Sequence, residues 1–78
     1  MLVLRTLEVR ALGYAIERVE ECDPLGVDNA SWFEVLCPYS GAVLGCAPTR
    51  LDAERIVIRR ELDSARRAIA LNGGTLAA

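Results

Sequence analysis

A chain of 78 residues with 53% hydrophobic and 26% charged residues is too apolar to be disordered, and it has room for one small globular domain, residues 1–78. It contains no histidine, so the commonest general base and the commonest metal ligand are both missing. The net charge of −2 disfavours the broad positive surface that a nucleic-acid-binding protein needs.

The N-terminal quarter carries two overlapping hydrophobic patterns. One has helical spacing and consists of Val9, Leu12, Ile16 and Val19. In the other, Tyr14 and Ile16 alternate with polar residues as they would in a strand. We predict a helix over residues 2–12 that ends at Gly13 in the left-handed conformation, followed by a strand over residues 14–20.

The start of the chain does not resemble a secretion signal. Arg5, Glu8 and Arg10 fall where a signal peptide would be apolar, and no run approaches the roughly 18 apolar residues of a membrane span. The odd number of cysteines fits reduced thiols. We therefore predict a cytoplasmic protein that does not associate with membranes.

The middle of the chain predicts a loop followed by a β-hairpin. The pairs Asp-Pro, Leu-Gly and Asp-Asn mark a loop over residues 22–31. Two short β-prone runs follow, residues 32–37 and 42–47. They are joined by Pro-Tyr-Ser-Gly, in which Pro suits the first corner of a type I turn and Gly supplies a left-handed residue.

This turn implies a register in which Cys37 pairs with Ala42 and Phe33 pairs with Cys46. One face of the hairpin is then the natural bed for a helix, and it consists of Phe33, Val35, Cys37, Ala42, Leu44 and Cys46. The two cysteines lie about 13 Å apart along the strands at 3.3 Å per residue, whereas a disulfide needs Cα atoms within about 7 Å. We expect two core thiols, and no disulfide, metal or cofactor.

The opposite face of the hairpin carries Trp32, Glu34, Leu36 and Val43. With two helices covering the other face, these residues are expected to be exposed, and an exposed Trp beside Leu and Val is a common interface anchor. In the alternative arrangement the N-terminal segment folds over this face and makes Trp32 ordinary core.

The C-terminal segment predicts a helix over residues 49–72. Thr49 is the expected N-cap, Asp52 is its capping partner, and Gly73-Gly74 ends the helix. One apolar stripe runs along it and consists of Leu51, Ile58, Leu62, Ala65 and Ile69. At 1.5 Å per residue this helix is about 36 Å long, against a radius of gyration near 11 to 12 Å for a compact chain, so its last turns should overhang the domain.

These elements give an α+β fold with the order α-β-β-β-α, in which a three-stranded antiparallel sheet has both helices packed on one face. This order resembles the double-stranded RNA-binding domain. The resemblance rests on Gly26-Val27-Asp28-Asn29 seven residues before Phe33, on Gly41 and Gly45, and on the stretch from Ala53 to Leu62. It implies binding of duplex RNA at the start of the last helix.

The phosphate-binding part of that family is altered in this chain. The family carries Lys-Lys-x-Ala-Lys at the start of its last helix, whereas this sequence has Arg50-Leu51-Asp52-Ala53-Glu54-Arg55, in which two phosphate ligands are replaced by Leu and Asp. The basic residues that RNA binding would use are Arg50, Arg55, Arg59 and Arg66. The minor-groove loop also lacks the family's Pro and His.

Charge is distributed unevenly along the chain. Residues 1–48 hold three arginines and seven acids, and residues 49–78 hold six arginines and four acids. The densest acidic stretch consists of Glu17, Glu20, Glu21, Asp23 and Asp28. Such a stretch could sit on a basic, nucleic-acid-binding groove of a partner protein.

The sequence contains no nucleophile–base pair, metal-ligand spacing or phosphate-binding loop, so we do not predict an enzyme. The leading hypothesis is a non-catalytic protein-binding module, a phage or mobile-element inhibitor of the anti-CRISPR type, that acts by occupying a partner's surface. One alternative is a domain that binds double-stranded RNA. The other is a structural homodimer joined through the overhanging helix or the exposed sheet.

Overall fold

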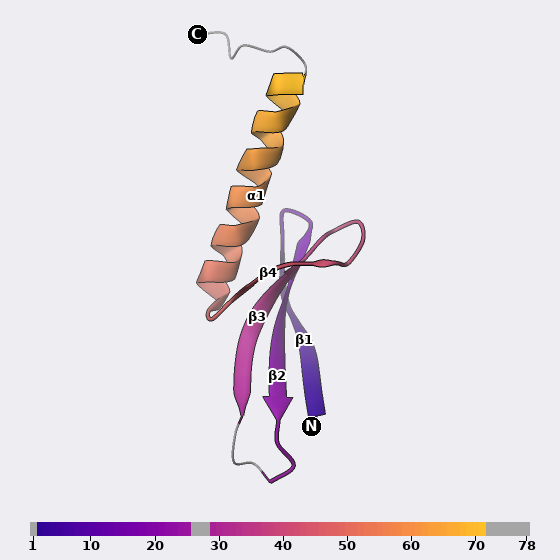
Figure 1. Cartoon of the computed structure of the whole chain (residues 1–78), viewed down its shortest axis with the longest axis vertical. Helices are drawn as coiled ribbons and strands as arrows, with labels where there is room; N and C mark the ends of the chain where they lie inside the picture. The colour runs from indigo at the N-terminus through magenta and orange to yellow at the C-terminus, as the bar shows by residue number, and fades with distance from the viewer. Residues whose placement is uncertain (1, 26–28, 72–78) are drawn as a thin grey trace.

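The computed structural model describes residues 2–25 and 29–71, which form one four-stranded antiparallel sheet followed by one helix (Figure 1). The elements are β1 (Leu2–Ala11), β2 (Tyr14–Cys22), β3 (Ala30–Leu36), β4 (Val43–Ala47) and α1 (Arg50–Leu71). Each strand pairs with the next along the chain, so the sheet has the order β1-β2-β3-β4. The predicted α-β-β-β-α order, with three strands and two helices, is therefore wrong.

The error lies at the N-terminus, where the predicted helix over residues 2–12 is strand β1. Leu12 and Gly13 have positive φ angles of 51° and 87° and form the two-residue turn between β1 and β2. Two consecutive left-handed residues are typical of a type I′ turn, whose twist matches that of paired strands. Gly13 has the predicted left-handed conformation, but it turns a hairpin instead of ending a helix.

The β3–β4 hairpin is confirmed at its turn, and its predicted register is wrong further along. The backbone N–H of Cys37 donates to the carbonyl of Ala42 across the turn at 2.8 Å, as the predicted pairing of these two residues requires. An extra residue, Leu44, then bulges out of β4, so that Phe33 lies opposite Ala47. Because a slip of one residue moves a side chain to the other face, Cys46 points away from the helix and is exposed.

The start of α1 agrees with the prediction. The backbone N–H of Asp52 donates to the Thr49 hydroxyl at 3.2 Å, and that of Ala53 donates to the Thr49 carbonyl at 3.1 Å. Thr49 is therefore the N-cap. The described helix ends at Leu71, and the predicted glycine stop lies outside the described residues.

The core forms where α1 crosses one face of the sheet, and it consists of Tyr14, Ile16, Val35, Ala47, Ala53 and Val57. The helix approaches closely at Gly45, where a Cβ atom would lie 3.3 Å from the Ile56 side chain. The predicted apolar stripe is not part of this contact, because Ile58 and Leu62 are each 52% exposed. The helix turns the side of Ala53, Ile56 and Val57 to the sheet.

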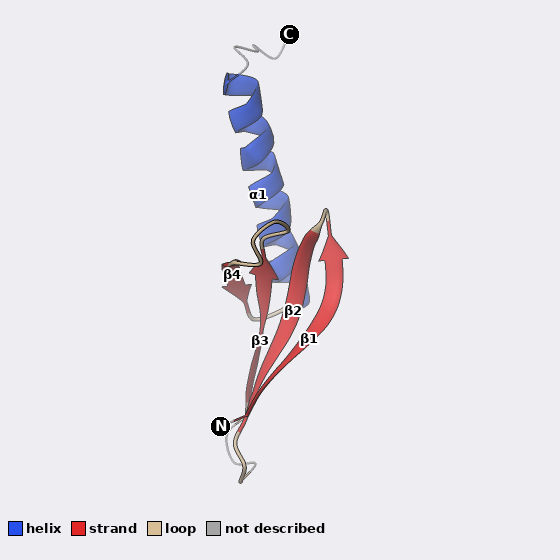
Figure 2. Cartoon of the chain, turned by 90° about the vertical axis from the view of Figure 1, so that its right-hand side faces the viewer, coloured by secondary structure: helices blue, strands red, loops and turns tan. Residues whose placement is uncertain are grey.

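The molecule is elongated, measuring 60 × 21 × 15 Å with a radius of gyration of 16.5 Å. The second half of α1 extends beyond the sheet, as predicted, and the far ends of β1, β2 and β3 extend the other way (Figures 1 and 2). Among the described residues, seven hydrophobic residues are buried and twelve large ones are exposed. Much apolar surface is therefore left without a partner in a single chain.

Candidate functional site

The sheet face turned away from α1 is uncovered in the described part of the chain. Because α1 packs on the face of Ile16 and Val35, their neighbours along each strand point to the opposite side. That side carries Val3, Arg5, Leu7, Arg10, Ala15, Glu17, Val19, Glu21, Ala30, Trp32, Glu34, Leu36, Val43 and Cys46. We call these residues the open face.

All four hairpin residues singled out from the sequence lie on the open face. Trp32, Glu34 and Leu36 alternate along β3, and Leu36 lies directly opposite Val43 on β4. Three of them lie on β3, which the bulge in β4 does not interrupt, and Val43 precedes the bulge. The shift in register therefore leaves all four on one face. The N-terminal segment extends the sheet as β1 and does not fold over this face.

The centre of the open face is a polar cluster of side chains from three strands, β1, β2 and β3. Arg5 Nη1 donates to Glu34 Oε1 at 2.7 Å and to Glu17 Oε1 at 3.3 Å. The Trp32 indole donates to the second oxygen of Glu34 at 2.9 Å. Glu34 is only 8% exposed, and both of its oxygens have a donor, which a buried carboxylate requires.

Arg5 also relieves a repulsion between two strands. Glu17 on β2 and Glu34 on β3 are directly opposite each other, and Arg5 lies within hydrogen-bond reach of both carboxylates. The hydrogen bond from Trp32 and then the Arg5 guanidinium hold the pKa of Glu34 below its ordinary value. The same two carboxylates, Glu34 first, raise the pKa of Arg5. The cluster is therefore a charged unit whose parts fix one another.

Beneath this cluster lies Val19, which is 1% exposed although it is on the open face. Its direct neighbours across the strands are Arg5 on β1 and Trp32 on β3, so these side chains are the ones placed to cover it. Trp32 is itself half-buried. The ring thus combines two roles that the sequence treated as alternatives: it covers a core residue and presents part of its surface to solvent.

An apolar border surrounds the polar centre. Val3 and Leu7 on β1 and Val43 on β4 are each about half exposed, and Leu36 is half-buried. Protein interfaces usually have an apolar core and a polar rim. The open face differs in having a polar centre, but the polar atoms there are paired with one another.

The predicted acidic stretch is divided between different surfaces. Glu17 and Glu21 lie on the open face, whereas Glu20 lies on the face of α1 because neighbouring strand residues alternate. Asp23 follows β2, and its carboxylate accepts a hydrogen bond from the backbone two residues on at 3.0 Å. Asp28 lies outside the described residues.

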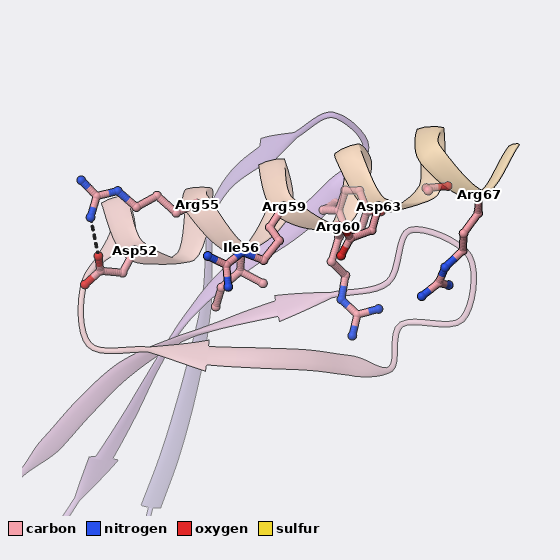
Figure 3. Close-up of a pocket in the computed structure, with 9 residues that line it drawn as sticks. Asp52, Arg55, Ile56, Arg59, Arg60, Asp63 and Arg67 are labelled. Carbon is pink, nitrogen blue, oxygen red and sulfur yellow. Dashed lines mark hydrogen bonds and ion pairs between the residues drawn. The ribbon is translucent and has the colours of Figure 1, made fainter. Parts of the chain in front are cut away.

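A second candidate surface is a groove of about 610 Å³ along α1 (Figure 3). It is lined by Tyr14, Asp52, Arg55, Ile56, Arg59, Arg60, Asp63, Ser64 and Arg67. Two of the arginines expected to bind RNA, Arg55 and Arg59, are in the groove, and Arg50 and Arg66 are not. Arg60 and Arg67 also line the groove, although the sequence did not predict them as RNA-binding residues. Their position in the groove depends on which side of α1 faces the sheet.

Acids neutralise part of the positive charge along α1. Arg50 lies 3.3 Å from Glu54, and Arg55 lies 3.2 Å from Asp52. Arg66 is 4.0 Å from an aspartate one turn earlier. Three of the four arginines predicted to bind RNA therefore already have an anionic neighbour.

The cysteines differ from the prediction of two core thiols. Cys46 is exposed on the open face and Cys37 is half-buried in the turn. Hydrogen bonds from the Ser40 side chain and from the backbone of Ser40 and Tyr39 lower the pKa of Cys37. Within the described ranges, no group of three or more Cys, Asp or Glu residues is arranged to hold a metal ion, and no helix is long and apolar enough to cross a membrane.

Comparison of the chain with protein-family models, curated proteins and solved structures gives no match. The resemblance to the double-stranded RNA-binding domain thus stays a prediction from residue spacing. The first helix that this resemblance implies is strand β1 in the structure.

Proposed function

We propose that this chain is a non-catalytic protein-binding module that holds its partner against the open face. The observation that carries the proposal is a half-buried Trp32 fixed at the centre of an uncovered sheet face. Its indole is held by Glu34, which is in turn held by Arg5. An aromatic side chain that is ordered before binding loses little conformational entropy in a complex, so more of its contact energy contributes to affinity.

The charge at one end of the open face supports a partner with basic groups there, because Glu21 lies at that end and Arg10 lies at the other, near the β1–β2 turn. Arg5 neutralises part of the charge of Glu17 and Glu34, whereas Glu21 has no ion pair within 4.0 Å among the described residues. Glu21 lies near the far end of β2, away from the polar centre. A carboxylate at that edge favours a lysine or arginine on the partner and mainly increases the rate of association.

Binding of this kind acts by occupying a surface, without chemistry on the partner. The proposal therefore includes an inhibitory role, and the assignment to a phage or mobile-element inhibitor of the anti-CRISPR type stays a prediction from small size and acidity. An affinity capture compares the intact protein with variants of the open face and so tests the binding surface directly.

The capture uses tagged protein and host extract, with Leu36→Asp/Val43→Asp as the test variant. These two apolar residues lie opposite each other and outside the cluster that covers Val19, so their replacement leaves that cluster in place. Tyr39→Asp is the control for an added surface acid away from the open face, because Tyr39 is 95% exposed in the turn. Some host proteins should be retained by both the wild type and the control. We expect the recovered amount of these proteins to be at least tenfold lower with the test variant. Equal recovery with all three proteins contradicts the proposal.

A second candidate function, binding of duplex RNA, is favoured by the gathering of Arg55, Arg59, Arg60 and Arg67 in one groove. Phosphate contacts release counterions, so affinity would fall steeply with salt. Titration of a labelled duplex at low salt tests it, and no binding at tens of micromolar protein removes it. If binding occurs, Arg60→Gln should reduce the salt slope by about 1, and Arg66→Gln, outside the groove, should not.

A further inference from the structure

Helix α1 has two hydrophobic sides, and the sheet covers only one of them. Ala53, Ile56 and Val57 pack on the sheet. At 3.6 residues per turn, Val57 and Leu62 are separated by about 140° around the helix axis. The second side, which we call the outer stripe, consists of Leu51, Ile58, Leu62, Ala65 and Ile69.

The outer stripe has the spacing of a coiled-coil seam. Successive members are seven, four, three and four residues apart, which is the alternation of a and d positions in a heptad repeat. Ile58 and Ala65 then occupy d positions, and Leu62 and Ile69 occupy a positions. Arg55 takes the remaining a position near the start of the helix.

We propose that a second copy of this chain docks on the outer stripe, and that the two α1 helices form a parallel two-stranded coiled coil. The charges beside the stripe select both the occupant and its direction. Glu54 and Glu61 occupy g positions. Arg59 and Arg66 occupy the e positions of the heptads that follow them, each five residues further along the helix.

In a parallel pair, each g residue faces the e residue of the following heptad in the partner helix. Glu54 then meets Arg59 of the second copy, and Glu61 meets its Arg66. The two-fold symmetry repeats both contacts, so every pair is attractive. In an antiparallel pair g faces g and e faces e, which sets Glu against Glu and Arg against Arg.

The contacts within one chain leave these residues available. Glu54 is paired with Arg50 at 3.3 Å, and Arg66 is 4.0 Å from Asp63, in exposed pairs that contribute little stability. Arg59 has no ion pair within 4.0 Å among the described residues. Burial and then a hydrogen bond to Glu61 raise the pKa of Tyr14, and the Glu61 carboxylate has a second oxygen for an arginine.

The shape of the molecule also fits this arrangement. The sheet packs on the side of α1 away from the outer stripe, so the two sheets of a parallel dimer lie on opposite flanks. The second half of α1 extends beyond the sheet (Figure 1). Helices in proteins are stabilised mainly by packing, and the second copy supplies that packing along the extension.

The mass of the full chain in solution tests the proposal. Sedimentation equilibrium of the wild type is expected to give twice the 8.5 kDa of one chain. Ile58→Asp/Leu62→Asp should give a single-chain mass, with the dissociation constant raised at least 100-fold. Tyr39→Asp, which adds one such charge in the turn, should leave the dimer unchanged. A wild type with the mass of one chain at several hundred micromolar overturns the proposal.

A variant that is expected to strengthen the dimer provides a test that unfolding cannot imitate. Arg55→Leu replaces a charged a residue, so it should tighten the dimer at least tenfold. The circular dichroism of every variant is recorded alongside its mass. An unchanged dissociation constant for Arg55→Leu shows that this residue is not in a seam and contradicts the heptad assignment.

Charge exchange tests the direction of the helices. Glu54→Arg/Glu61→Arg should weaken the dimer, and adding Arg59→Glu/Arg66→Glu should restore it, because the g–e attractions return with opposite sign. An antiparallel dimer has like charges before and after both changes and shows no such restoration.

Cross-linking gives an independent check of the direction. Two Ile69→Cys chains should form a disulfide between the introduced thiols, because a parallel pair places them side by side. Arg67→Cys, outside the seam, is the control. Equal cross-linking of both variants, mapped by peptide mass, overturns the parallel arrangement.

Discussion

At the scale of single residues, the stability of the open face depends on how its charges are satisfied. Glu34 accepts from Trp32 and Arg5 at once, and these two side chains flank the buried Val19. Removing one partner of such a cluster leaves a polar group without its hydrogen bond, which costs more than the bond itself contributes. The residues that are exposed for binding thus also support the sheet.

Replacing Trp32 should therefore reduce folding stability as well as binding. Trp32→Ala exposes Val19 and takes a donor from Glu34, and we expect the free energy of unfolding to fall by about 2 to 3 kcal/mol. Trp32→Phe retains an apolar cover and loses only the donor, so it should cost about 1 kcal/mol. Urea denaturation measures both. Equal stability of the alanine variant and the wild type would show that Trp32 covers nothing.

The ionisation of Glu34 should make stability depend on pH. Its pKa in the folded protein is below the ordinary value of 4.5, so its stabilising effect is complete above that value and is lost as the pH falls through the folded pKa. Glu34→Gln keeps an acceptor for Trp32 and removes the charge. At pH 7 it should melt several degrees below the wild type, and the difference should shrink below pH 4.5. A difference that stays constant between pH 7 and pH 2.5 excludes this role.

At the scale of secondary-structure elements, local signals predicted some parts well. The N-cap at Thr49 and the Pro-Tyr-Ser-Gly turn depend on a few neighbouring residues, and the structure has both. Strand β1 and the bulge at Leu44 depend on contacts with other strands, which no short window contains. The helix over residues 2–12 was predicted because a left-handed Gly13 is compatible with a helix end and with a hairpin turn.

The same distinction applies to the candidate site. Alternation along β3 was enough to place Trp32, Glu34 and Leu36 on one face. Arg5 was missed because it reaches that face only once residues 2–11 are a strand beside β2. The acids of β2 were grouped because they are close in the sequence, although alternation turns Glu20 and Glu21 to opposite faces.

That alternation provides a matched pair of charge reversals. If the partner lies on the open face, Glu21→Arg should slow association several-fold at low salt and have little effect at high salt. Glu20→Arg makes the same change one residue away on the other face, so it should leave association nearly unchanged. Binding kinetics at two salt concentrations measure both. An equal effect of the two variants argues against a partner on the open face.

The β1–β2 turn contains an unfavourable residue that can be improved. Leu12 has a φ of 51° and is 67% exposed, so it bears the cost of a left-handed conformation without burying its side chain. Leu12→Asn should stabilise the protein by about 0.5 to 1 kcal/mol, because Asn-Gly is preferred in type I′ turns. Leu12→Ala is the control and should gain nothing. Identical melting temperatures for the two variants would contradict the proposed type I′ turn.

At the scale of the whole molecule, the chain is long and has a small core. Its radius of gyration is 16.5 Å, against the 11 to 12 Å of a compact chain of this length. In this extended shape, neither the outer stripe nor the open face is covered by another described part of the chain. The proposed dimer covers the outer stripe and leaves two open faces on opposite flanks. A protein with two such faces can bind two sites on one assembly, and this increases its apparent affinity.

The most direct test of partner binding is covalent footprinting of side chains in the free protein and in the captured complex. We expect labelling of Trp32, Leu36 and Val43 to fall several-fold in the complex, whereas the exposed Tyr39 should be labelled equally in both. Unchanged labelling of the three residues, with protection appearing instead along the arginine groove of α1, would contradict the proposal that the open face binds the partner.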